Sequence, residues 1–246
     1  MSSRTILPIA ACALLALLAM DRTGGFARQG APAPEFTTDF DLNNAVFSPN
    51  GGNQYFSLRP GTFLRFEGDD DGEFVELEIE ALDQIKIITF DLNGESITAR
   101  CRVVREREWA DGELVEISRN YFTRDTRNGN IYYCGEDVDI FENGVIVDHE
   151  GAWRAGVDGA LPGLIMPSIF LLGSRYYQEH APGVALDKGR NAESGLTIDT
   201  PAGTFENCVL VRETSDLEDG VSIKVYAPGV GLIEDDGVQL TEFSLP

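Results

Sequence analysis

The sequence predicts an all-β protein, a twisted antiparallel barrel or half-barrel of about ten strands. From residue 39 onward, short runs of β-branched and aromatic residues alternate with turn signals about every 8–12 residues. Some runs alternate strictly between apolar and polar residues, as in 74–80. The chain also lacks a long amphipathic helical pattern. Together these features favour a meandering sheet.

The first element is an N-terminal export signal, predicted over residues 1–27. Arg4 precedes an apolar run at 6–20, and small residues follow it. A membrane span needs about 20 apolar residues, so this run is short for one. Two processing routes stay open: cleavage of the signal, or lipidation at Cys12 inside the apolar run. Either route predicts an exported protein, periplasmic or extracellular.

The remaining chain divides into a lead-in and one domain. Residues 28–38 are small, polar and proline-containing, which predicts a flexible segment. Residues 39–246 are long enough to bury a sizeable core, and we predict that they form a single β domain. Within them we predict no transmembrane segment, because no stretch is apolar enough to span a bilayer.

Turn signals separate the predicted strands. Asn-Gly at 93–94 and 143–144, and Asp-Gly at 111–112, favour the positive φ angles of tight hairpin turns. The acidic run at 69–72 and the polar segment at 127–130 separate further strands. We therefore predict that the first two thirds of the chain are a meander.

Residues 151–173 break this pattern. Five glycines and two prolines there exclude a regular strand or a long helix. We predict a Gly/Pro-rich crossing loop, with room for a short helix near 164–171. Strands are expected again at 196–213, 220–227 and 237–244.

The net charge of −22 excludes some partners. Nucleic acids and anionic membrane surfaces attract basic patches, so neither is predicted as a partner. Phosphate-binding and dinucleotide-binding motifs are missing from the sequence, and no cofactor is predicted.

The candidate metal ligands are His149, His180, Asp69 and Asp71. The chain has two histidines, each near a predicted strand end, and such a pair can hold a metal together with a carboxylate. The run at 69–73 offers oxygens that suit calcium, although its spacing differs from that of an EF-hand loop. The alternative, which such residues more often adopt, is a pair of exposed histidines and a solvated hairpin turn.

Three cysteines follow the predicted signal: Cys101, Cys134 and Cys208. Export favours one disulfide among them, which leaves one thiol over. Their spacing selects no pair and forms no CxxC motif. Buried free thiols are the alternative.

Short motifs along the chain match, in order, those of a known family. They lie at 53–62, 102–109, 111–116, 121–122, 129–133, 135–138, 151–153, 155–160, 165–167, 177–179, 200–208 and 226–232. This set resembles a widespread family of exported bacterial proteins of unknown function, over residues 40–244. Its tail motifs are distantly similar to those of half-barrel periplasmic proteins of the lipoprotein-carrier type. The resemblance implies a curved antiparallel sheet with an apolar inner face. The chain departs from the family's turn at 168–174, where it is apolar instead.

Five apolar and aromatic residues in and near the crossing loop are candidates for ligand binding. They are Trp153, Leu164, Met166, Phe170 and Tyr176. Side chains of this kind can line a cleft, although on strands they more often pack in the core.

Two hypotheses about function follow. The first is an exported, non-catalytic protein that binds an apolar small molecule, a lipid or an envelope protein in a concave sheet. The second is a hydrolase or metal-dependent enzyme that uses carboxylates together with His149 and His180. The sequence contains no serine elbow and no HExxH motif that would favour the second.

Overall fold

The computed structural model describes residues 35–70 and 72–246. The predicted signal at 1–27, Cys12 and Asp71 therefore lie outside the described residues. The rest forms one sheet of sixteen strands, paired antiparallel throughout, with a single turn of 3-10 helix, η1 (Leu42–Asn44). The prediction of an all-β, twisted antiparallel fold is confirmed. The strands outnumber the predicted ten because several short ones, such as β8, pair at the margins of the sheet.

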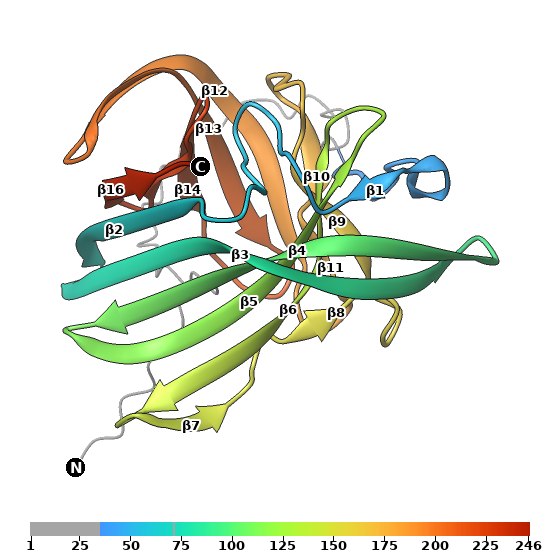
Figure 1. Ribbon diagram of the computed structural model, residues 1–246, viewed down its shortest axis with the longest axis horizontal. Helices are drawn as coiled ribbons and strands as arrows, with labels where there is room; N and C mark the ends of the chain where they lie inside the picture. Colours follow the sequence, from blue (N-terminus) through green and yellow to red (C-terminus); the bar gives the residue numbers. More distant parts are fainter. Residues whose placement is uncertain (1–34, 71) are drawn as a thin grey trace, which may run out of the picture.

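Figure 1 shows strands β2 to β6 fanned side by side, with the β12–β13 hairpin rising across one end of them. The strands are β1 (Phe47–Ser48), β2 (Phe63–Asp70), β3 (Glu73–Leu92), β4 (Glu95–Ala110), β5 (Glu113–Asp125), β6 (Ile131–Glu142), β7 (Val145–Asp148), β8 (Trp153–Arg154), β9 (Leu161–Met166), β10 (Arg175–Tyr177), β11 (Glu179–His180), β12 (Asp187–Thr200), β13 (Gly203–Ser215), β14 (Ser222–Ala227), β15 (Gly231–Asp235) and β16 (Val238–Ser244).

The sheet is nearly closed. Its strand order is β10-β12-β13-β14-β15-β16-β2-β3-β4-β5-β6-β9-β11, so β10 and β11 stand at its two ends. These two strands are consecutive in the chain, separated only by Gln178. The backbone N–H of Gln178 donates to the carbonyl of Asp187 at 2.7 Å, which ties the end of β11 to β12. One face of the curved sheet therefore lines the interior of the protein.

The predicted hairpin turns are confirmed. Asn93 and Gly94 have φ angles of 54° and 81° and connect β3 to β4. Asp111 and Gly112 (48° and 81°) connect β4 to β5. Asparagine, aspartate and glycine tolerate these left-handed angles, whose twist matches that of the flanking strands. The chain thus needs only two residues to reverse direction at each point.

The predicted alternation at 74–80 is also confirmed. Val75 and Leu77 are buried in the second of two hydrophobic clusters, which also contains Phe66, Ile233 and Leu240. The glutamates that alternate with them lie on the outer face, where ion pairs bridge neighbouring strands. These pairs include Arg65–Glu76, Arg105–Glu80 and Arg107–Glu78.

Residues 151–173 are less irregular than predicted. They contain β8 and β9, and β9 lies where the short helix was expected to begin, so that expectation is wrong. Glycine is what permits a strand here: a Cβ at Gly163 would stand 2.2 Å from the carbonyl oxygen of Gln178. With hydrogen alone on Cα, β9 fits between β6 and β11.

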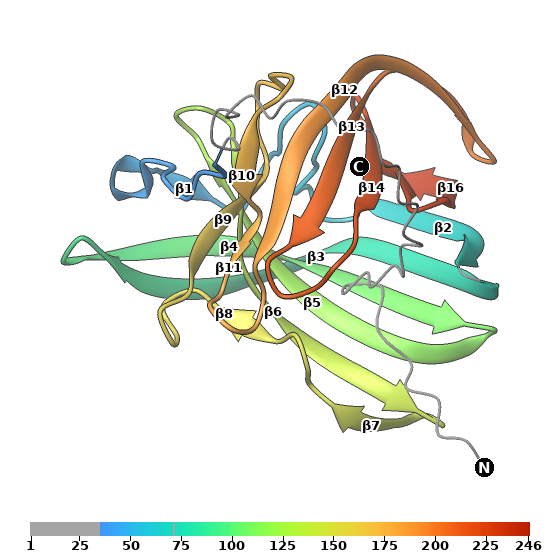
Figure 2. The ribbon, with the colours of Figure 1, turned by 180° about the vertical axis from the view of Figure 1, so that it is seen from behind.

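The larger hydrophobic cluster lies around Phe90, Tyr132 and Met166. Met166 belongs to β9, which pairs with β11 at one end of the sheet. Figure 2 shows this side from behind, with β9 and β10 beside β12. The described end of the predicted lead-in also packs here, because Thr37 forms a parallel bridge with Tyr176. Within 35–70 and 72–246, no helix has the length and apolarity that a membrane span requires.

Candidate functional site

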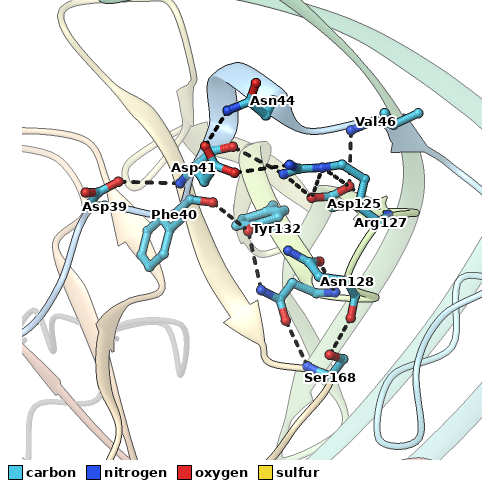
Figure 3. Close-up of polar contacts among 11 residues, drawn as sticks. Asp39, Phe40, Asp41, Asn44, Val46, Asp125, Arg127, Asn128, Tyr132 and Ser168 are labelled. Atoms are coloured by element: carbon cyan, nitrogen blue, oxygen red, sulfur yellow. Dashed lines mark hydrogen bonds and ion pairs between the residues drawn. The ribbon is translucent and has the colours of Figure 1, made fainter.

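One polar cluster fixes the start of the domain to the turn between β5 and β6 (Figure 3). Arg127 Nη2 lies 2.8 Å from Asp125 Oδ2, and its Nη1 lies 3.1 Å from Asp41 Oδ2. The backbone N–H of Val46 also donates to Asp125, at 3.1 Å. Burial alone would raise the pKa of Asp125, but hydrogen bonds from Arg127 and Val46 lower it below its usual value. These carboxylates are fully engaged, so we assign the cluster a structural role.

A second group of carboxylates occupies the interior face of the sheet. Glu108 on β4 lies directly opposite Glu116 on β5, and Glu136 on β6 lies opposite Asn120. The residues Glu108, Glu116 and Glu136 are 8, 5 and 7% exposed. Like charges opposite each other in an antiparallel pair destabilise it when both are ionised. The fold therefore places three acidic groups where water screens them poorly.

Strands from the other side of the interior add further carboxylates. We call the whole group the interior acidic cluster: Glu106, Glu108, Glu116, Glu136, Glu179, Asp187, Glu213 and Asp235. Lys224 on β14 lies among them. Its Nζ lies 3.0 Å from Asp235 Oδ2 and 3.6 Å from Glu213 Oε2. Its positive charge also acts on Glu106 and Asp187.

Burial perturbs the acidity of these groups. It raises the pKa of Glu106 and Glu116 to about 7 and that of Glu108 and Glu136 to about 8. Neighbouring carboxylates add to the effect, as Glu116 does for Glu108. At neutral pH these carboxyl groups are therefore mixtures of the protonated and ionised forms.

Several oxygen atoms in and beside the cluster lack a hydrogen-bond donor. They are Glu116 Oε2, Asp235 Oδ1, Gln178 Oε1 and Ser222 Oγ, all buried. Buried polar atoms in folded proteins nearly always have a partner. Gln178 Oε1 and the oxygens of an ionised carboxylate are acceptors, so they can receive an N–H or O–H from a bound molecule.

An apolar pocket of about 110 Å³ borders the interior acidic cluster. Its wall combines strands from both sides of the interior with the segment that follows Gln54. The apolar wall includes Phe56, Leu64, Ile79, Val104, Phe122 and Leu232. Glu106 and Lys224 also line the pocket. A molecule in it would therefore touch hydrocarbon on most sides and charged groups on one.

The five residues predicted to bind a ligand lie elsewhere in the core. Trp153, Leu164, Met166 and Tyr176 are buried, and Phe170 packs its ring against Tyr55 at 6.1 Å. Trp153 Nε1 donates to Glu179 at 3.2 Å, and the Tyr176 hydroxyl donates to Asn191 at 2.8 Å. None of the five lines the pocket described above, although Ile165 does. Their role as ligand contacts stays a prediction.

The predicted metal ligands are not brought together by any contact in the structure. His149 follows β7, and its Nδ1 lies 2.6 Å from the carbonyl oxygen of Val138. His180 lies in β11, against the ring of Tyr177 at 5.8 Å, and burial lowers its pKa. Asp69 accepts the backbone N–H of Gly72 at 3.0 Å, at the end of β2. Across the described residues, no three histidine, cysteine or acidic side chains are arranged to hold a metal ion.

The three cysteines are buried free thiols. Cys101 and Cys134 lie in the larger hydrophobic cluster, and Cys208 lies in the second. Burial raises the pKa of Cys101, with Cys134 beside it adding to the shift. Thiols of this kind are weak nucleophiles, which gives them a packing role in this structure.

Sequence reasoning missed the acidic cluster. The signal is visible at 105–108, where charged residues occupy consecutive positions and hence both faces of one strand. Arg105 and Arg107 lie on the outer face with their ion pairs, which leaves Glu106 and Glu108 facing inward. Lys224 on β14 also faces the interior, where it lies opposite Asp235 and lines the pocket.

Comparisons with known proteins leave the chain without an assigned family. No family model matches it, and no curated protein matches it. Among solved structures, it is similar to a protein described as exported, with a YmcC-like fold, from Bacteroides fragilis NCTC 9343. That similarity has a TM-score of 0.39 and 15% identity, and it covers 82% of this chain and 100% of the other.

A second solved structure is described as a lipoprotein from Parabacteroides distasonis ATCC 8503. Its TM-score is 0.32 at 13% identity, and the similarity covers 78% of this chain and 97% of the other.

Proposed function

We propose that this chain is an exported, non-catalytic binding protein that holds an apolar ligand inside its curved sheet. The observation that carries the proposal is the pocket of about 110 Å³, whose wall is mostly aliphatic and aromatic. Ligand sites are typically concave and apolar, with a few polar groups that fix orientation. The predicted signal at 1–27 supports export.

The size of the pocket limits the ligand. A cavity of about 150 Å³ in another protein accepts benzene, so this one suits a ring or a chain of about five or six carbons. Each buried methylene contributes about 0.8 kcal/mol, which gives roughly 4 kcal/mol for such a chain. We therefore expect a lone hydrocarbon group to bind in the millimolar range, and additional contacts to be needed for tighter binding.

An envelope protein partner is the second candidate. After β9 the chain exposes Ile169, Leu171 and Leu172, with exposed fractions of 80, 67 and 54%. This is the segment where the sequence departs from the family that it resembles. An exposed apolar loop of this kind is a typical contact site for another protein.

A hydrolase remains the alternative of a different class. Glu106 lines the pocket, and its pKa of about 7 suits a general acid or base. Neither His149 nor His180 lines that pocket, so the roles first assigned to them have no support there. Turnover of a panel of ester and glycoside substrates that is abolished by Glu106→Gln would favour this alternative.

Methyl NMR with n-hexanol tests the binding proposal. We expect saturable shifts at Leu64, Ile79 and Val104, which line the pocket. Val104→Phe should fill the pocket and remove the shifts. Val145→Phe, at an exposed position on β7, is the matched control and should leave them unchanged. Shifts that are absent or scattered over the surface would refute apolar binding at this site.

A further inference from the structure

We propose that the ligand is a primary or secondary amine attached to a short alkyl or aryl group, and that the interior acidic cluster receives its ammonium group. This inference rests on the proposed function, because it assigns the hydrocarbon part to the same pocket. Glu106 belongs both to the pocket wall and to the cluster, so it marks where the two parts of the ligand would join.

The charges in the interior favour a cation over an anion. Lys224 is the basic group that lines the pocket, and it is already engaged by Asp235 and Glu213. A carboxylate ligand would have to displace one of these and would then face the remaining acidic groups. An ammonium would instead meet Glu106 directly, at the polar side of the pocket. In a poorly hydrated interior the interaction energy between two charges is much larger than in water, so the preference for a cation is larger too.

An independent observation also points to a donor-bearing ligand. The residue Glu116 is 5% exposed, and its buried Oε2 accepts no hydrogen bond. It faces the interior opposite Glu108 and lies close enough to Glu106 to be influenced by its charge. Asp235 Oδ1 is unpartnered in the same way. An ammonium carries two or three N–H donors, which matches a site that offers several acceptors.

The arrangement suits an organic cation better than a metal ion. Metal sites need three or more ligands converging at about 2–2.6 Å from one point, and the acidic groups of the described residues are not arranged in that way. An alkylammonium is larger, tolerates longer contacts and brings its own apolar part. The adjoining hydrocarbon wall would bury that part.

Isothermal titration calorimetry with a matched series separates these ideas. The series is n-hexylamine, n-hexanol and hexanoate, which share one chain and differ in head-group charge. At about pH 7.5, we expect n-hexylamine to bind at least roughly tenfold more tightly than n-hexanol, and hexanoate to bind most weakly.

Two variants link the difference to the cluster. Glu106→Gln and Glu116→Gln should each reduce the preference for hexylamine over hexanol, because each removes an acidic group that would receive the ammonium. Glu78→Gln, on the outer face of the same strand pair, is the control and should change neither. Glu106 is partly exposed, so its variant keeps the test valid if Glu116→Gln fails to fold, as judged by circular dichroism.

The outcomes distinguish the two proposals. Equal binding of hexylamine and hexanol would overturn the amine inference and leave the apolar binding function standing. Tightest binding by hexanoate would also overturn it, and would assign Lys224 as the partner of an anion. If no member of the series binds, both the inference and the proposed function fail.

Discussion

Two regions of this molecule bury carboxyl groups, and the pKa values of these groups shift in opposite directions. The Asp125 side chain is fully buried at the turn after β5, and it accepts hydrogen bonds from Arg127 and Val46. Glu116 is almost as buried on the interior face of the same strand, yet one of its oxygens accepts none. The pKa of Asp125 is lowered and that of Glu116 is raised to about 7.

The difference shows that burial alone does not decide the charge of a buried acid. Burial pushes both pKa values upward, and only the hydrogen bonds to Asp125 reverse the effect. A paired carboxylate stabilises the fold, whereas an unpaired one costs free energy whenever it ionises. A cluster of buried acids in which Glu116 and Asp235 each have an unpartnered oxygen is therefore better explained by binding than by folding.

The largest expected effect comes from breaking the paired region. Arg127→Ala leaves Asp125 without its ion-pair partner, so the Tm should fall. Arg59→Ala, at an exposed position, is the control in thermal unfolding. A Tm equal to that of the control would show that the Arg127 cluster is not a structural anchor.

The unpaired region should respond in the opposite direction. Glu108→Gln removes a buried acid whose pKa is about 8, so it should stabilise the protein by about 2 kcal/mol above that pH. The measurement is chemical unfolding at about pH 9. Destabilisation by this variant would mean that the Glu108 carboxylate has a partner that the structure does not provide.

The stability of the unmodified protein should also depend on pH in a way that reflects both regions. The folded-state pKa values of Glu106, Glu108, Glu116 and Glu136 lie at about 7–8, above the reference value of 4.5. The folded state therefore binds more protons than the unfolded state, and stability falls as pH rises from 4.5 through about 7–8. Asp125 acts oppositely, because its contribution is lost only as pH falls below 3.8.

The expected Tm maximum therefore lies between about pH 4 and 6. Glu108→Gln should flatten the alkaline side of the profile and leave the acid side unchanged. A maximum at about pH 8 or above would contradict the raised pKa values.

The smallest effect is expected on the outer face of the same strands. Glu78 pairs with Arg107, whose side chain is one-third exposed (34%), and such pairs contribute little. Glu78→Gln should therefore lower the free energy of unfolding by at most about 1 kcal/mol. A gain in stability here, like that expected for Glu108→Gln, would show that the two faces do not differ.

Local chemistry explains which parts of this fold are predictable from the sequence. Asn93-Gly94 and Asp111-Gly112 specify their hairpins, because few other residues tolerate those φ angles. Alternation at 74–80 likewise identifies a strand with one buried face. Such signals act over a few residues, and they predicted the meander of β2 to β7 well.

The site depends on contacts that span the whole chain. β9 forms around Gly163 because the distant Gln178 backbone comes close, which local propensity does not report. A lysine on an alternating strand usually faces solvent, and Lys224 faces inward because the sheet curves until β14 confronts β4. The sequence does contain one relevant signal. All four residues at 105–108 are charged, so both faces of that strand carry charges and one of these faces is the interior.

The most direct test of this account is a carbon-13 NMR titration of the side-chain carboxyl groups. We predict midpoints at about 8 for Glu108 and Glu136 and at about 7 for Glu116, against a midpoint below 3.8 for Asp125. Adding n-hexylamine should lower the glutamate midpoints and leave that of Asp125 unchanged. Glutamate midpoints near the ordinary 4.5 would contradict the claim that the interior holds buried acids poised to receive a cation.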